Sequence, residues 1–379
     1  MDSSVYLSAS IRAQLEAQRG AGDDVIDFTI GNPDFPPPPE IVDHLARSIA
    51  DPGNHRYAAH ESAGERDYRE AVAGMYRRRF DVTLDATRNT LALLGCKESA
   101  HYLCMALVEP GDVVMICEPA YTTYRGNAAL FGAEIHAIQC RPEHGYLPDW
   151  SEVPASVLRR TKILFLNYPN NPTGAVMPLD AFEKAVALAH EYGFVICNDS
   201  AYAELYYDAP PPSVLSVPGA LEVAVEVGSL SKSFNLCGWR LGYMVGHPGV
   251  VERVLRLKQF TDAGPFPALQ QAGAAALRLS DTFHRDLRAR YRVRRDRVVD
   301  GLRACGYDVF PPPAGMFVWA RTPDAERSDE HVARLLREHR IACNPGGVYG
   351  LSGTSFVRFA LSVNEALIEE AMYRLGKSF

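Results

Sequence analysis

Residues 162 to 199 read KILFLNYPNNPTGAVMPLDAFEKAVALAHEYGFVICND, and this stretch decides the fold class. Its two apolar runs, 162–167 and 194–198, are short and rich in β-branched and aromatic residues, which predicts two buried strands. Between the runs, four apolar residues recur at the spacing of one helix face: Phe182, Ala185, Val186 and Ala189. A strand, a helix and a second strand in this order predict a parallel pair covered by the helix.

The same alternation extends from about residue 90 to residue 250. Further strands are predicted at 90–94, 113–116, 223–228 and 242–246. We therefore predict an α/β protein whose large domain spans residues 45–280. The Arg-rich C-terminal part changes to helix, short strands and helix, so residues 1–44 and 281–379 are predicted to form a smaller α+β domain.

Composition limits the function classes. The 379 residues carry a formal charge of -7 without a long block of one sign, which argues against a nucleic-acid partner and favours small molecules. The eight cysteines show neither CxxC pairs nor metal-ligand spacing, so we expect no metal site and reduced thiols. Neither a signal peptide nor a membrane span is evident, and we expect a cytoplasmic protein that does not bind membranes.

Polar motifs follow the predicted strands. Because the carboxyl ends of parallel strands share one edge of a sheet, these motifs should meet at one site. They occupy five loops, at residues 95–97, 118–121, 167–174, 199–202 and 229–232.

The loop after the strand at 223–228 carries the strongest signal. Lys232 follows Ser229 and Ser231, and Arg240 comes eight residues later. Hydroxyl and guanidinium groups are suitable phosphate ligands. An amine beside a phosphate site is what pyridoxal 5'-phosphate (PLP) requires to form a Schiff base, so we predict PLP as the cofactor and Lys232 as its covalent partner.

The run from residue 229 to 242 resembles the PLP-lysine signature of fold-type I class I/II aminotransferases, and closely resembles the subgroup that includes LL-diaminopimelate aminotransferase. Similar stretches occur along nearly the whole chain, at 27–35, 57–64, 94–124, 146–149, 167–174 and near Ser362. The resemblance implies a PLP-dependent transferase fold of type I, with a mainly parallel seven-stranded sheet flanked by helices. It also implies a homodimer with shared active sites.

The resemblance assigns roles around the cofactor ring. Lys232, Asp199 and Tyr202 are the expected catalytic residues, and the Asp199 carboxylate should keep the pyridine nitrogen protonated so that the ring withdraws electrons. Tyr202 and Asn171 are similar to the family's donors to the 3'-oxygen. Tyr121 resembles the aromatic residue that stacks on the ring.

The phosphate is expected at the turn that follows Gly95, where the amides of an opening helix favour an anion. By resemblance, Cys96, Lys97 and Tyr57 join Ser229, Ser231 and Arg240 as expected cofactor ligands. Cys96 stands where the family often has a hydroxyl residue, which removes one side-chain bond. Tyr57 resembles the tyrosine that reaches the phosphate from the neighbouring subunit.

Three residues are expected to bind the substrate. Arg358 is similar to the family's clamp for the α-carboxylate, a pairing that suits guanidinium geometry. Gly31 would add a close backbone N–H, and Asn171 would contact substrate as well as cofactor. The implied reaction exchanges the amino group of an L-amino acid with a 2-oxo acid, and the freed Lys232 amine moves the proton.

Two alternatives remain open from the residues. One is a non-transaminating PLP lyase or synthase that performs γ-elimination, γ-replacement or carbon–carbon bond or ring formation, for example on S-adenosylmethionine. The other is a non-catalytic binding protein, which would be expected to lack Lys232 or Asp199. Side-chain specificity is also open: five polar residues near the motifs either face the substrate or are structural, namely His60, Glu61, Lys97, His101 and Asn235.

Overall fold

The computed structural model describes residues 13–16, 18, 20, 22, 24–58 and 61–376, with Glu61 described by its backbone only. Its main feature is a seven-stranded sheet in which β8 alone runs opposite to the other six strands. In spatial order the strands are β2 (Thr90–Leu93), β8 (Gly242–Gly246), β7 (Ala224–Ser229), β6 (Val195–Asp199), β5 (Thr161–Asn167), β3 (Val113–Glu118) and β4 (Glu134–Gln139). This confirms the mainly parallel sheet and six strands predicted from sequence.

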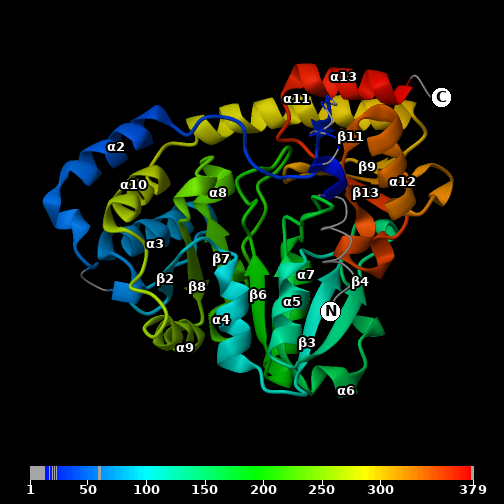
Figure 1. Ribbon diagram of the computed structural model, residues 1–379. Helices are drawn as coiled ribbons and strands as arrows, with labels where there is room; N and C mark the ends of the chain where they lie inside the picture. Colours follow the sequence, from blue (N-terminus) through cyan, green and yellow to red (C-terminus); the bar gives the residue numbers. More distant parts are fainter. Residues whose placement is uncertain are drawn as a thin grey trace.

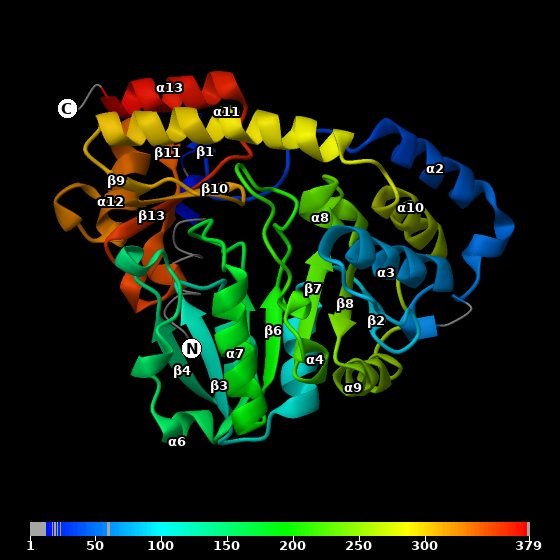
Figure 2. The same ribbon diagram turned by 180° about the vertical axis from the view of Figure 1, so that it is seen from behind.

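Helices cover both faces of this sheet. On one face lie α4 (Glu98–Leu107), α5 (Thr123–Leu130) and α9 (Pro248–Lys258), in front of the strands in Figure 1. On the other lie α3 (Arg66–Phe80), α7 (Leu179–Tyr192) and α10 (Pro267–Leu277), seen in Figure 2. Side chains alternate between the two faces, since Ile163 and Phe165 pack with the first group whereas Leu164 and Leu166 pack with the second.

A second, smaller sheet is built from the C-terminal part. Its antiparallel strands, in order, are β12 (Asn344–Pro345), β13 (Phe356–Ala360), β10 (Phe317–Arg321) and β9 (Asp308–Phe310). Packed around them are α11 (Thr282–Ala304), α12 (Ser328–Arg334) and α13 (Glu365–Gly376), and Figure 1 shows α11 and α13 running together along one side of the molecule.

The N-terminal segment joins this smaller sheet region. β1 (Ile26–Asp27) pairs in parallel with β11 (Ile341–Ala342), and Phe28 packs edge-on against Phe359. The next helix, α2 (Pro39–Ala50), packs against α10 of the large-sheet region. The predicted boundary between residues 44 and 45 therefore falls inside a helix, and the division into two domains stays a prediction.

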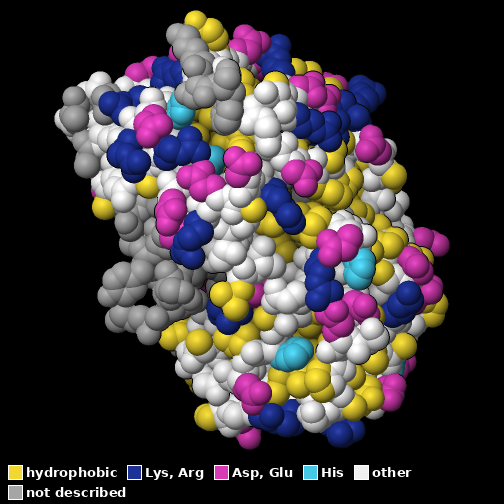
Figure 3. Space-filling model, turned by 90° about the vertical axis from the view of Figure 1, so that its right-hand side faces the viewer, with side chains coloured by type: hydrophobic (Ala, Val, Ile, Leu, Met, Phe, Trp, Pro, Cys, Tyr) yellow, Lys and Arg dark blue, Asp and Glu magenta, His cyan; other side chains and the backbone are white. Residues whose placement is uncertain are grey.

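Two further α-helices are short, α6 (Ala155–Leu158) and α8 (Leu230–Ser233). No helix among the described residues is both long and apolar enough to cross a membrane. The eight cysteines are free thiols, six of them buried, as expected from their apolar surroundings. On the face shown in Figure 3, acidic and basic side chains are interspersed.

Candidate active site

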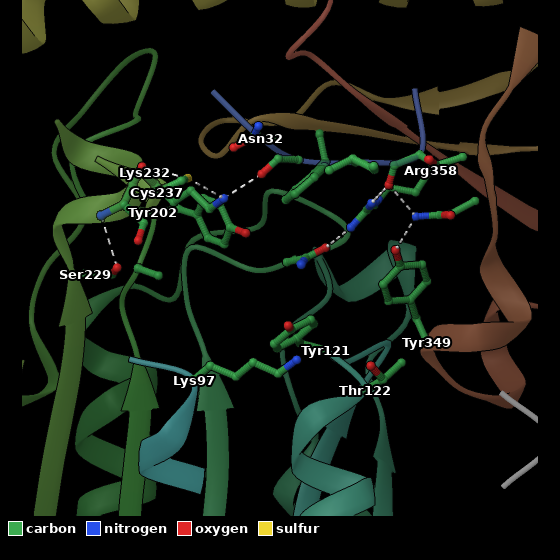
Figure 4. Close-up of a pocket in the computed structure, with 18 of the residues that line it drawn as sticks. Asn32, Lys97, Tyr121, Thr122, Tyr202, Ser229, Lys232, Cys237, Tyr349 and Arg358 are labelled. Atoms are coloured by element: carbon green, nitrogen blue, oxygen red, sulfur yellow. Dashed lines mark hydrogen bonds between the residues drawn. The ribbon is translucent and has the colours of Figure 1, made fainter. Parts of the chain in front are cut away.

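One cavity of about 660 Å³ lies between the carboxyl ends of β5, β6 and β7, the segment 29–32, and β13. Figure 4 shows Lys232 and Ser229 on one side and Arg358 and Tyr349 on the other. Apart from Tyr57, every residue predicted to belong to the site lines this cavity: Gly31, Cys96, Lys97, Tyr121, Asn171, Asp199, Tyr202, Ser229, Ser231, Lys232, Arg240 and Arg358.

Lys232 stands in α8, which begins directly after β7. Because the helix starts at the sheet edge, its side chain reaches the cavity rather than the core. The Nζ atom donates to the Gly31 carbonyl at 2.5 Å and lies 3.4 Å from Cys237 Sγ. Both partners are uncharged, so no ion pair within the described residues holds the amine away from a ligand.

Asp199 ends β6 and is 8% exposed. Tyr124 Oη donates to its Oδ2 at 2.8 Å, and the Ala201 N–H donates to its Oδ1 at 3.1 Å. Burial raises the pKa of the Asp199 carboxyl group, while the Tyr124 and Ala201 donors act in the opposite direction. A carboxylate accepts about four hydrogen bonds, so this one keeps capacity for a positively charged donor.

The turn at Gly95 lets the backbone approach the Arg240 side chain closely. Gly95 has φ +82°, and a Cβ there would collide with the Arg240 guanidinium group. On the facing side Ser229 Oγ accepts the Ser231 N–H at 3.1 Å, and Arg240 Nη1 lies 3.5 Å from Ser231 Oγ. Backbone amides, two hydroxyls and a guanidinium therefore meet at the start of α4, as a phosphate site requires.

Cys96 lies within this turn. Burial raises the pKa of its thiol well above the usual value, so the side chain is a neutral, weak donor. The Cys96 thiol therefore does not replace the hydrogen bond that a hydroxyl side chain would make at this position.

Arg358 lies on β13 at the opposite end of the cavity and is 5% exposed. Its Nη1 donates to Asn171 Oδ1 at 2.9 Å and its Nη2 to the Thr29 carbonyl at 2.7 Å. Its Nε has no hydrogen-bond partner within the described structure although it is buried. A buried, unpaired N–H on a cation is costly unless an anion from outside the chain completes it.

These observations test the fit of PLP to the chain. An amine, a buried carboxylate with spare acceptor capacity and a phosphate cradle all face one cavity, with Arg358 opposite. The hydroxyl group of Tyr202 has no hydrogen-bond partner in the described part of the chain and is itself available as a donor. The donor set fits the cofactor.

Some candidates lie elsewhere. Tyr57 is 85% exposed and lies beside the segment 259–263. Neither His101 nor Asn235 lines the cavity. His101 pairs with Asn127, and Asn235 donates to the Pro36 carbonyl. His60 and the side chain of Glu61 lie outside the described residues.

Sequence reasoning missed several residues of the site. Asn167 ties the loop together, since it donates to the Asp199 carbonyl at 2.8 Å and accepts the Asn171 N–H at 2.9 Å. Tyr124 stands three positions after Tyr121 in a stretch that carried the family resemblance, but the sequence does not say which hydroxyl meets Asp199. Asn344 and Tyr349, which also line the cavity, belong to none of the motifs, and Cys237 lies within the run 229–242, where the resemblance gives it no role.

A covered, mostly parallel sheet whose strand ends present a lysine and a carboxylate to one cavity, beside a turn suited to a phosphate, defines a class of protein, the PLP-dependent transferases of fold type I. The family model for aminotransferases of class I and II matches residues 23–375. The chain belongs to this family, and it is a PLP-dependent aminotransferase that acts on amino acids and 2-oxo acids.

Individual relatives support this assignment. The chain is 40% identical over 374 residues to an LL-diaminopimelate aminotransferase of Nitratidesulfovibrio vulgaris, covering 98% of this chain and 96% of that protein. It is 38% identical to one of Moorella thermoacetica, with 98% and 95% coverage. The comparisons do not favour the alternative of a lyase or synthase.

Solved structures agree. Substrate-bound BacF of Bacillus subtilis superposes with a TM-score of 0.94 at 30% identity, covering 100% of this chain and 97% of that one. A probable N-succinyldiaminopimelate aminotransferase of Thermus thermophilus gives 0.92 at 34% identity, with 98% and 100% coverage. The fold type expected from the sequence is thus confirmed.

Proposed function

We propose that the amino donor is a long amino diacid, with LL-diaminopimelate, the substrate in the names of the relatives, as the first candidate. The observation that carries this proposal is a further cation, Lys97, which lines the cavity besides Lys232, Arg240 and Arg358. The Lys97 ammonium lies 5.9 Å from the Tyr121 ring centre and has no hydrogen-bond or ion-pair partner in the described part of the chain. A distal carboxylate would suit it.

Lys97 and Arg358 would bind different ends of the substrate. Arg358, with its unpaired Nε, suits the α-carboxylate. In the view of Figure 4, the Lys97 side chain runs along Tyr121, and Arg358 lies beyond this ring. A donor with two carboxylates would thus be held at both ends, whereas a monocarboxylic amino acid would use Arg358 alone.

Within this site each residue has one task. Bound PLP supplies an aldehyde that takes up the amino group and a ring that withdraws electrons from the substrate Cα. Lys232 Nζ is the group placed to remove the Cα proton and to return it. Asp199, oriented by Tyr124, would stabilise positive charge on the ring nitrogen. Tyr202 and Asn171 would donate to the 3'-oxygen.

We also propose that the chain works as a homodimer with shared sites. Tyr57 is 85% exposed and Phe260 is 90% exposed, and both line one surface depression at 57 and 259–263. Large apolar side chains gathered on a surface are typical of an interface. Tyr57 would reach the phosphate of the neighbouring subunit. A cytoplasmic location stays a prediction.

Two donors of equal length separate the contributions of the distal carboxylate. Three donors are tested separately with the purified enzyme and one 2-oxo acid acceptor: 2-aminopimelate, 2-aminoheptanoate and LL-diaminopimelate. The 2-oxo acids formed are measured by mass spectrometry. We expect Lys97→Met to raise KM for the two diacids by about tenfold, the value of one charge-assisted contact, and to leave KM for 2-aminoheptanoate unchanged.

All donors are compared at saturating PLP, so that any effect of Lys97→Met on cofactor affinity, expected if Lys97 also contacts the phosphate, is common to them and cancels. An equal loss with both donors of matched length would contradict the proposal, and so would better activity on the monocarboxylic donor.

A further inference from the structure

A buried lysine stands behind the phosphate turn. Lys258, the last residue of α9, is 0% exposed and donates to Glu98 Oε1 at 2.8 Å and to Asp262 Oδ2 at 2.7 Å. Its ammonium also lies 5.0 Å from the Tyr102 ring centre. None of these residues lines the cavity of the candidate active site. Because a buried ammonium is costly unless it is paired, these two carboxylates stabilise Lys258 in its charged form.

Glu98 connects this lysine to the turn. Glu98 is the first residue of α4, and the Oε1 atom that accepts from Lys258 also accepts the Leu94 N–H at 2.9 Å. The Leu94 carbonyl in turn accepts from Arg240 Nη2 at 3.4 Å. The backbone that leads into Gly95 is therefore held by a carboxylate whose position Lys258 fixes.

Asp262 extends the connection to a second segment. Its Oδ1 accepts the Gly264 N–H at 2.8 Å, and its backbone carbonyl accepts from Ser62 Oγ at 2.5 Å. Tyr102 Oη lies 3.2 Å from Asp262 Oδ2. The ion triad thus lies between the phosphate turn and the segment that follows Tyr57.

Charge alone does not explain the triad. One ammonium between two carboxylates carries a net negative charge, which would repel rather than attract a phosphate. The triad would therefore support an anion site through geometry: Glu98 accepts from the Leu94 N–H and so orients the turn that follows.

We propose that Lys258, acting through Glu98, is a positioning residue for the phosphate turn at residues 94–97, and so sets the affinity for the phosphate group of the cofactor. The proposal rests on the assignment of the phosphate to this turn. It predicts that the triad matters for a cofactor with a phosphate and not for the same ring without one.

The test compares PLP with pyridoxal, which has the same aldehyde and ring but lacks the phosphate. Dissociation constants are measured by titrating the apoenzyme and following the visible absorbance of the bound cofactor. For Lys258→Met and Glu98→Ala we expect the PLP affinity to fall about tenfold, the effect of losing a charge-assisted contact, and the pyridoxal affinity to stay within about twofold.

Two further variants serve as controls. Glu98→Gln should retain most of the PLP affinity, because the amide oxygen still accepts from the Leu94 N–H. Lys162→Met removes another lysine that faces a carboxylate, Asp112 at 3.9 Å, but on the far end of β5, and should change neither constant. Thermal unfolding of each variant shows that the titrations are made on folded protein, and Glu98→Ala serves should Lys258→Met fail to fold.

Wild-type PLP affinity in a destabilised Lys258→Met or Glu98→Ala protein would overturn the proposal, as would an equal loss for PLP and pyridoxal. Arg240→Ala separates the proposal from the assignment that it rests on. A PLP-specific loss in Arg240→Ala without one in Lys258→Met refutes the positioning role alone. Unchanged PLP affinity in both variants refutes the phosphate assignment as well.

Discussion

Two neighbouring strands each carry a buried carboxylate, Asp199 on β6 and Glu226 on β7, and the two carboxylates accept different numbers of hydrogen bonds. Behind the sheet, Glu226 of β7 is 1% exposed and does not line the main cavity. Its carboxylate accepts four hydrogen bonds of 2.7 to 3.2 Å, from Tyr76 Oη, Ser213 Oγ, Asn198 Nδ2 and Val214 N. Four donors use the full acceptor capacity of the group.

On the cavity side, Asp199 of β6 accepts only two such bonds, from Tyr124 and Ala201. Burial raises the pKa of both Asp199 and Glu226, so both carboxylates bear a desolvation cost. Full satisfaction marks a structural carboxylate and partial satisfaction marks one that awaits a ligand. The comparison therefore distinguishes function from packing where burial alone does not.

The largest expected effect is on the cavity side. Asp199→Asn keeps the size of the side chain but removes the charge that should stabilise the protonated ring nitrogen. We expect kcat to fall about 10³-fold, as when one preorganised electrostatic contact is lost from an active site. Steady-state kinetics at saturating PLP would measure it, and a kcat within threefold of the unmodified enzyme would refute the role of Asp199.

Behind the sheet the same kind of change should act on stability instead. Glu226→Ala leaves four buried donors without an acceptor, and we expect the unfolding free energy to fall by about 3 kcal/mol. Urea denaturation of the apoenzyme measures this. In the protein that remains folded, kcat should change less than threefold, and a larger loss of kcat would show that Glu226 is not purely structural.

The sequence could anticipate much of this arrangement because parallel strands end at one sheet edge. Asp199 and Lys232 follow predicted strands, and both line the cavity. The edge strand β4 was missed because Glu134, His136 and Gln139 break its apolar pattern. An edge strand is paired on one side only, so it needs fewer apolar residues than a central one.

The sequence could not predict contacts between residues that lie far apart along the chain. The partner of Asp199, Tyr124, is 75 residues away, and Asn171 lies 187 residues from Arg358. Spacing carries no information about such contacts. The same holds for Lys258, which as an isolated lysine in a helix would be expected at the surface.

The smallest expected effect is the pH dependence of stability on the cavity side. Because the pKa of Asp199 is raised in the folded protein, the folded state binds more protons than the unfolded state between the ordinary aspartate pKa and the raised value. The stability that the protonated group contributes is present below that window and is lost as pH rises through it. Asp199→Asn lacks this loss.

Urea denaturation of both apoenzymes over a pH series should therefore show the variant gaining stability relative to the unmodified protein as pH rises through the window, by on the order of 1 kcal/mol. Carboxyl groups with lowered pKa values, such as Asp67 and Asp281, have the opposite pH dependence, but they are common to both proteins and cancel in the difference. A difference that stays constant with pH would mean that Asp199 titrates alike in both states. Its two hydrogen bonds would then fully offset its burial, and the distinction from Glu226 would rest on the number of donors alone.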